Sequence, residues 1–209
     1  DEMHTVSETP RPARGPKRPA SPKVAILFVT QNRHTADIGR RMAVAARGLG
    51  WTPALYDFEC VNDPRILADY DRAVVGAPVY RGRFSDRVVG FLQDATPRLV
   101  ELDARFFGVC LAAASTNPSV RAEMSDYRER LLELSEWIPE RIEFFAGKLD
   151  YPRYSFLVRL MMRRIAKNAG LSTDTSRSHI YTDWDRVDAF IVDMLGPGSA
   201  TGHAQALPG

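Results

Sequence analysis

The chain has few of the residues that mark secreted, metal-binding or membrane-spanning proteins. Its 209 residues include only two cysteines, Cys60 and Cys110, so we expect no disulfide framework and a reduced, cytosolic-side compartment. The four histidines are scattered, and no spacing of His, Cys, Asp or Glu indicates a metal site. No apolar run reaches the roughly 18 residues that a membrane-spanning helix needs. Residues 1–22 also lack the apolar core of a secretory signal.

Acidic residues are missing from one long segment. Residues 151–170 read YPRYSFLVRLMMRRIAKNAG and hold five Lys or Arg and no acid, although the whole chain has a net charge of only +2. On a helical wheel, Leu157, Val158, Met161 and Ile165 share one broad face. A basic amphipathic helix is typical of a membrane-surface or partner-binding segment. The alternative is a core helix with a solvated basic face, because docking onto a sheet needs an equally wide apolar face. The basic residues expected to contact an anionic membrane or substrate carboxylates are Arg153, Arg159, Arg163, Arg164 and Lys167.

The two ends of the chain are also poor in apolar residues. Residues 1–22 are rich in Pro, Arg and Ser and are predicted to be a disordered basic extension, most simply a solvated linker. Residues 196–209 are predicted to be a flexible tail. The sequence therefore predicts a single domain over residues 23–195, and we expect no nucleic-acid partner.

Predicted strands and helices alternate between the two tails. Ser85 is expected to cap a helix that runs from Asp86 to about Gln93 or further. In the next predicted helix, residues 118–135, Tyr127, Leu131 and Leu134 share one side. Alternation of this kind predicts a doubly wound α/β fold, with five parallel strands in the order 2-1-3-4-5 and a basic helical insertion at about 150–180, before the last helix. The predicted strands are residues 24–29, 51–58, 72–77, 105–112 and 143–147, and the helices are residues 36–47, 86–93, 118–135 and 183–195.

The first strand-to-helix turn is the strongest candidate for a binding site. It follows a buried apolar strand and places hydroxyl, amide, guanidinium and imidazole groups at the start of a helix, where unpaired backbone N–H groups and the helix dipole favour an anion. In a sheet of this order, ligands bind beside the first strand. We therefore predict that the turn holds the phosphate of flavin mononucleotide (FMN). The alternative is a plain turn capped by Thr35. The turn residues are Thr30, Gln31, Asn32, Arg33, His34 and Thr35.

Two further loops leave the same edge of the predicted sheet. Residues 77–84 offer the aromatic rings of Tyr80 and Phe84, and Gly82 permits an unusual backbone there. Residues 112–117 are small and polar and would border a ring through their backbone groups. The alternatives are a turn with packing aromatics for the first loop and a helix start capped by Ser115 or Asn117 for the second. The predicted cofactor-binding residues of these loops are Ala77, Pro78, Val79, Tyr80, Arg81, Gly82, Arg83, Phe84, Ala113, Ala114 and Ser115.

Several of these segments together are similar to a known family. The run FAGKLDYPRYSFLVRLMMRRIAKNAG followed by STDTSRSHIYTDW closely resembles the flavodoxin-like, quinone-dependent (menaquinone-dependent) protoporphyrinogen IX dehydrogenases, and so, more loosely, do VAILFVTQNRHTADIGRRM and YDRAVVGAPVYRGRFS. The resemblance covers about residues 23–195. It implies an FMN enzyme of haem biosynthesis that oxidises protoporphyrinogen IX or a related tetrapyrrole and passes the electrons to menaquinone or ubiquinone. It also implies a peripheral place on the cytoplasmic side of the inner membrane, with a soluble cytoplasmic protein as the second expectation.

Two positions depart from the family pattern. Arg33 stands where members usually carry glycine, and an arginine at positive φ costs about 1 kcal/mol or more. Its guanidinium either compensates by pairing with the phosphate or the site has weakened. Pro78 removes one amide donor. The catalytic acid or base cannot be assigned; Tyr80, Asp174 and His179 are candidates only by their chemistry.

Other functions compete with the dehydrogenase. A flavodoxin-type electron carrier would need no basic insertion, and a flavin reductase would act on another substrate. A third alternative is a non-enzymatic, membrane-associated module whose flavin site has decayed, which Arg33 favours.

Overall fold

Five parallel strands form the centre of the molecule. The computed structural model describes residues 21–29, 33–57, 60 and 63–197. The sheet has the order β2-β1-β3-β4-β5, and each neighbouring pair is parallel, as predicted. Thr30, Gln31, Asn32 and nearly all of the two predicted tails lie outside the described residues. The strands are β1 (Lys23–Phe28), β2 (Thr52–Asp57), β3 (Arg72–Pro78), β4 (Arg105–Cys110) and β5 (Ile142–Ala146).

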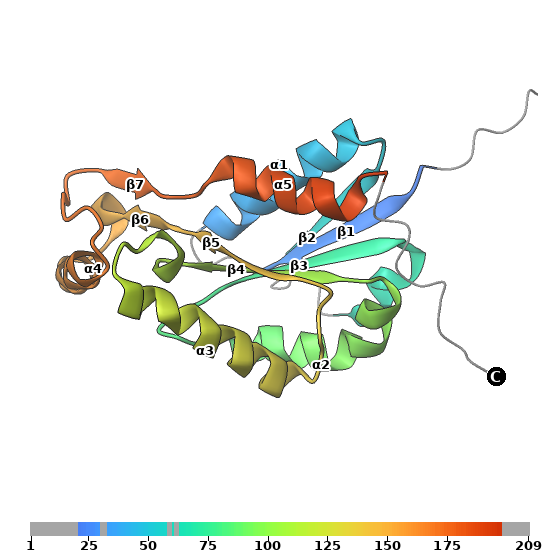
Figure 1. The fold of residues 1–209 in the computed structure, drawn as a ribbon, viewed down its shortest axis with the longest axis horizontal. Coiled ribbons are helices and arrows are strands. Elements are labelled where there is room, and N and C mark those ends of the chain that lie inside the picture. Colours follow the sequence, from blue (N-terminus) through green and yellow to red (C-terminus); the bar gives the residue numbers. More distant parts are fainter. Residues whose placement is uncertain (1–20, 30–32, 58–59, 61–62, 198–209) are drawn as a thin grey trace, which may run out of the picture.

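Two pairs of helices cover the two faces of the sheet (Figure 1). α1 (His34–Gly48) and α5 (Trp184–Leu195) lie on one face, and α2 (Asp86–Glu101) and α3 (Pro118–Ser135) on the other. Each face has its own apolar cluster, because strands buried on both sides carry apolar residues without alternation. Short 3₁₀ helices complete the connections: η1 (Pro64–Asp69), η2 (Ala112–Ala114) and η3 (Tyr151–Arg153).

The insertion lies beyond the carboxyl ends of the central strands (Figure 1). It contains β6 (Lys148–Asp150), which pairs antiparallel with β7 (Ser178–Ile180), and α4 (Phe156–Asn168). Leu149, Tyr151 and Ala166 form its small core. No helix in the described part of the chain is long and apolar enough to cross a bilayer.

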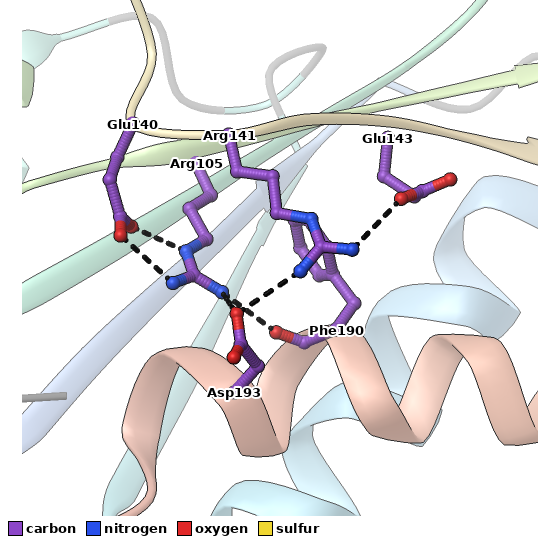
Figure 2. A network of polar contacts seen from close by, with 6 residues as sticks. All are labelled: Arg105, Glu140, Arg141, Glu143, Phe190 and Asp193. Carbon is purple, nitrogen blue, oxygen red and sulfur yellow. Dashed lines mark hydrogen bonds and ion pairs between the residues drawn. The ribbon is translucent and has the colours of Figure 1, made fainter. Parts of the chain in front are cut away.

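A charged network lies at the opposite, amino end of β4 (Figure 2). The Arg105 side chain is only 5% exposed and donates to both carboxylate oxygens of Glu140, at 2.5 and 3.0 Å. It also reaches Asp193, at 2.8 Å, and the carbonyl oxygen of Phe190 on α5. Arg141 joins from the side, with a bond to Asp193. The network ties the start of β4 and the residues just before the edge strand β5 to the last helix.

The structure corrects some of the predicted boundaries. α1 begins at His34, two residues earlier than predicted. α2 starts after its predicted Ser85 cap and ends at Glu101, so the longer of the two expected ends is the one found. The buried residues Ala95 and Leu99 extend the apolar stripe past Pro97, so burial outweighs the roughly 3 kcal/mol cost of proline inside a helix.

Other corrections concern α3 and the insertion. Leu134 is 42% exposed, because the buried line on α3 runs through Tyr127, Leu131 and Ser135 at a spacing of four. β6 and β7 were not predicted, because three residues each are too few to show a periodic pattern.

Candidate flavin-binding site

The start of α1 has an unusual backbone. Arg33 is the N-cap residue, with φ 60° and ψ −15°, and it makes no side-chain capping bond. Thr35 therefore does not cap the helix, which corrects the alternative reading of the turn; it lies in the first helical turn instead. A left-handed conformation is strained for any residue with a Cβ, by about 1–2 kcal/mol. The structure thus requires at position 33 the conformation for which glycine is suited.

His34 is held on the inner side of the same helix start. Its Nε2 atom lies 2.6 Å from Oγ1 of Thr182, and that hydroxyl donates to the carbonyl oxygen of Ala146 at 2.7 Å. A hydroxyl has one proton to donate, so Nε2 of His34 must be the donor in the first bond and Nδ1 is left as an acceptor. Burial lowers the pKa of His34, which keeps the ring neutral near pH 7.

Next to His34 in the helix start lies the buried hydroxyl of Thr35. The residue is 3% exposed, and no hydrogen bond of its side chain is found within the described residues. Thr35 and His34 line a cavity of about 340 Å³ at the carboxyl edge of the sheet, here called the inner cavity. A buried, unpaired hydroxyl is costly without a ligand, so it indicates a polar group that binds there. The other walls are Pro78–Tyr80, Val109–Leu111, Gly147, Lys148, Tyr154, Val158, Met161 and Met162.

The loop after β3 supplies a tight turn beside this cavity. Tyr80 and Arg83 exchange backbone hydrogen bonds at 2.9 and 3.1 Å, with Arg81 at φ 51° and Gly82 at φ 74° between them. Within the described residues, the amides of Arg81 and Gly82 have no partner. Arg130 on α3 fixes the turn by donating to the carbonyl oxygen of Gly82 at 2.5 Å. The turn can therefore bind a flat polar ligand through the amides of Arg81 and Gly82 and the half-exposed ring of Tyr80.

Cys110 ends β4 in the wall of the inner cavity. Burial raises the pKa of its thiol to about 11, although the amides of Ala112 and Ala113 donate to the sulfur and oppose this shift. The side chain is therefore a protonated thiol at neutral pH. It acts as an apolar wall rather than as a nucleophile.

Several predicted site residues lie elsewhere. Phe84 is 6% exposed and packs edge-on against Phe106 in the core, and Arg83 lies beside it, away from the inner cavity. Ser115 is buried and donates to the carbonyl oxygen of Ala169, while Asn117 caps α3. Ala77, Ala113 and Ala114 do not line the inner cavity either. Phe84 therefore packs in the core, as the alternative for its loop expected, and of the two residues offered as helix caps it is Asn117 that caps α3.

The two candidates chosen by chemistry in the insertion are remote from the cavity. His179 lies 2.8 Å from the carbonyl oxygen of Asp174, and neither residue lines the inner cavity. Tyr80 does line it.

The structure brings in residues that the sequence analysis overlooked. Gly147 and Lys148 directly follow β5, and Thr182 closes the insertion beside His34. The carboxyl ends of all parallel strands share one edge of the sheet, so their place at the end of the fifth predicted strand could have indicated Gly147 and Lys148. Thr182 gave no such signal, since 148 positions separate it from His34.

The basic helix α4 does not bury its apolar face against the sheet. Ala166 is its only buried residue, and Phe156, Leu157 and Leu160 are 77%, 75% and 57% exposed. Arg159 turns inward and donates to the carbonyl oxygens of Tyr151 and Tyr154 at 3.1 and 3.2 Å. It therefore holds α4 on the insertion, whereas the remaining basic residues expected at a surface, Arg153, Arg163, Arg164 and Lys167, are exposed.

The residues present fit a flavin mononucleotide. The inner cavity runs from the helix start with the Thr35 hydroxyl to the exposed ring of Tyr80. The turn that follows Tyr80 carries the amides of Arg81 and Gly82, which have no partner within the described residues. A helix start suits a phosphate, and an apolar slot with a few donors suits a flat heterocycle.

Comparisons with known proteins show which family the chain belongs to. The family model described as "Flavodoxin domain" matches residues 25–176. A protein named protoporphyrinogen IX dehydrogenase [quinone] from Leishmania major is 33% identical over 177 residues, which cover 83% of this chain and 75% of that protein. A protein of the same name from Escherichia coli (strain K12) is 32% identical over 169 residues, 80% of this chain and 92% of that protein. Among solved structures, oxidised flavodoxin 2 from Bacillus cereus matches with 20% identity and a TM-score of 0.43, over 58% of this chain and 83% of that one.

Proposed function

The chain belongs to the flavodoxin-domain family of the quinone-type protoporphyrinogen IX dehydrogenases, and from this premise we propose that it oxidises protoporphyrinogen IX to protoporphyrin IX in haem biosynthesis. It is a flavin-dependent oxidoreductase, with FMN as its cofactor. The substrate would lose six electrons and six protons in three equal rounds. Each round would reduce one membrane quinone, menaquinone or ubiquinone, to its quinol.

The observation that carries the proposal is the inner cavity. It lies where the sheet order places a ligand, beside β1 and β3, and the buried Thr35 hydroxyl in its wall has no partner in the described part of the chain. The insertion closes its far side through Tyr154, Val158, Met161 and Met162. A plain electron carrier has no need of this added wall.

Each group of residues has a separate role in holding the reactants. FMN, when bound, supplies the two-electron chemistry. Thr35 and the backbone at the start of α1 bind its phosphate, and the free amides of Arg81 and Gly82 donate to its polar edge. Leu111 and the protonated Cys110 exclude water from the apolar part of the cavity. His34, fixed by Thr182, keeps a neutral acceptor at Nδ1 beside the phosphate end.

We further propose that α4 docks on an anionic membrane surface on the cytoplasmic side. Its exposed apolar residues Phe156, Leu157 and Leu160 are interleaved with Arg163 and Lys167. This combination favours the interface of a bilayer, where apolar side chains enter the acyl boundary and basic ones remain at the headgroups. A peripheral position would bring the protein to the lipid-dissolved quinone.

An anaerobic flavin-reduction assay tests the proposed reaction. The protein is loaded with FMN and mixed with protoporphyrinogen IX without oxygen; we expect loss of the absorbance of the oxidised flavin, and its return when a soluble menaquinone analogue is added. Coproporphyrinogen III in place of protoporphyrinogen IX tests substrate choice. A preparation that binds no FMN would favour a decayed site. Bound flavin that no porphyrinogen reduces would favour an electron carrier or a reductase with another substrate.

A further inference from the structure

A second cavity, here called the outer cavity, lies beside the inner one. Its volume is about 800 Å³, within the range of small-molecule sites. The loop Val79–Gly82, the α3 segment from Val120 to Arg130 and the inner side of α4 form its walls. Six residues line both cavities, so ligands in the two would be separated only by this shared wall: Val79, Tyr80, Cys110, Leu111, Met161 and Met162.

Apolar side chains line the middle of the outer cavity. Met161, Met162 and Ile165 face it from α4, and Leu111 from the end of β4. Met161 and Ile165 are 36% and 43% exposed, although they belong to the apolar face of their helix. Methionine side chains adapt to flat and irregular apolar ligands. A small hydrophilic anion such as phosphate would leave these side chains without a partner, so the expected ligand has an apolar body.

Guanidinium groups from three different elements stand around this apolar centre. They belong to Arg81 on the turn, Arg130 on α3 and Arg164 on α4. Arg130 is already oriented by its bond to Gly82, at 2.5 Å. Within the described residues the Arg164 side chain has neither a hydrogen bond nor an ion pair.

Two carboxylates lie on the same walls, both from α3. The Glu123 side chain accepts a hydrogen bond from the hydroxyl of Tyr127 at 2.5 Å, and the second carboxylate is that of Asp126. Three cations against two anions leave the lining residues with a net positive charge. A neutral quinone would satisfy the apolar centre and leave the guanidinium groups unused.

We propose that the outer cavity binds an apolar ring system that carries carboxylate arms, with Arg164 and Arg130 receiving the carboxylates and Met161 and Met162 in contact with the ring. The inference rests on the proposed function, which supplies a ligand of this class, a tetrapyrrole with two propionate arms. The shared wall then brings the ring beside the inner cavity, and the charged arms fix which edge of the ring points outward.

Porphyrin binding to the FMN-loaded full chain tests the site without turnover. The probe is protoporphyrin IX, the stable ring with both carboxylates, followed by its fluorescence in lipid-free buffer; the dimethyl ester of the same ring has no charge. Arg164→Gln should weaken binding of the free acid about tenfold, the loss of one charged contact, and leave binding of the ester unchanged. Arg163→Gln is the matched control, because Arg163 is the neighbouring exposed arginine on α4 and does not line the cavity.

The possible results separate this site from the proposed function. Equal affinity of the Arg164→Gln variant and the unchanged chain for the free acid would overturn the carboxylate site. So would an equal loss in Arg163→Gln, which would indicate general attraction by a basic helix, or tighter binding of the ester than of the acid. FMN affinity, measured by quenching of flavin fluorescence, should be unchanged in both variants. Failure of the unchanged chain to bind FMN would contradict the proposed function, whereas normal FMN binding with charge-independent porphyrin binding would contradict only this inference.

Discussion

Nε2 of His34 lies 2.6 Å from Oγ1 of Thr182, across 148 positions of the chain. The bond joins the start of α1 to the end of the insertion, and the Thr182 hydroxyl donates a hydrogen bond to the carbonyl oxygen of Ala146 at the end of β5. A single buried hydroxyl therefore holds three segments of the candidate site together.

Replacement of Thr182 by valine should destabilise the protein. Valine has nearly the same shape but leaves the Nε2–H of His34 and the carbonyl oxygen of Ala146 without this partner. Buried groups left unpaired cost about 1–3 kcal/mol, so the free energy of unfolding in urea should fall by about that amount. Thr182→Ser keeps the hydroxyl and should lose less than half as much; equal losses in the two variants would contradict this role of the hydrogen bonds.

His34 should make stability depend on pH on the acid side. Burial lowers the pKa of His34, so the unfolded chain takes up a proton more readily than the folded chain. The contribution to stability is fully present above the ordinary value of about 6.5 and is lost as the pH falls from there toward the folded-state pKa. Glutamine at position 34 keeps an N–H donor but cannot titrate. Urea unfolding at a series of pH values should show the unchanged chain losing stability relative to His34→Gln below about pH 6.5, and a constant difference would exclude this assignment.

Arg33→Gly should relieve backbone strain. Arg33 has a φ of 60°, which glycine adopts freely, so the substitution removes the strain of the folded state. Glycine also makes the unfolded chain more flexible, which reduces the gain, and we expect a net rise in the free energy of unfolding of about 0.5–1 kcal/mol. Arg33→Ala keeps the strained Cβ and removes the same guanidinium, so it isolates the effect of charge. We expect FMN affinity to fall in Arg33→Ala, because Arg33 is the N-cap residue of the helix whose start is proposed to bind the phosphate. Unchanged FMN affinity in that variant would show that the guanidinium does not pair with the phosphate.

Arg105 and Arg141 should differ in their effect on stability. The Arg105 side chain is 5% exposed and contacts Glu140, Asp193 and Phe190, whereas Arg141 is 46% exposed (Figure 2). Arg105→Met should lower the free energy of unfolding by about 1–3 kcal/mol, because two carboxylates lose their buried partner. Arg141→Met should change it by less than about 1 kcal/mol, as for surface ion pairs. Urea unfolding measures the change in unfolding free energy for each variant. Equal changes in Arg105→Met and Arg141→Met would contradict a special contribution of the buried Arg105 to stability.

Vesicle binding tests the membrane role of α4. The double variant Arg163→Glu, Lys167→Glu should bind vesicles that contain phosphatidylserine at least about thirtyfold more weakly, since each basic residue contributes about 1 kcal/mol. Arg159 stays unchanged because it holds the helix in place. Arg121→Glu with Arg128→Glu on α3 makes the same charge change on another exposed helix and should bind nearly as well as the unchanged chain. Binding should weaken with added salt. Equal losses in the two double variants would show that net charge, not α4, drives binding.

The sheet could be predicted from the sequence because buried parallel strands carry long apolar runs. The run over residues 24–29 and the alternation of strands with helices predict a doubly wound parallel sheet, and five strands favour the order 2-1-3-4-5, which places the site at the carboxyl edge. Contacts between distant segments could not be predicted. Nothing near His34 in the sequence indicates Thr182, and the aromatic rings of Tyr80 and Phe84 look equivalent in the sequence although one is exposed and the other lies in the core.

The insertion shows the same limit. Periodicity identifies α4 as amphipathic, but it does not distinguish a face packed on a sheet from one that lines a cavity, since both need the same residue types. Met161 and Met162 therefore entered the site only through the structure. The inward turn of Arg159 also depends on the carbonyl groups of η3, which no spacing along the helix reveals.

Strand β4 begins at Arg105 in the charged network and ends at Cys110 in the wall shared by the two cavities. The groups that brace the molecule and the groups that line its site are thus at opposite ends of the same six-residue strand. Thermostability could therefore be engineered at one end while selectivity is engineered at the other. For two substitutions so far apart, the changes in unfolding free energy should simply add. The usual conflict between a more stable enzyme and a more active one should accordingly be weak in this protein.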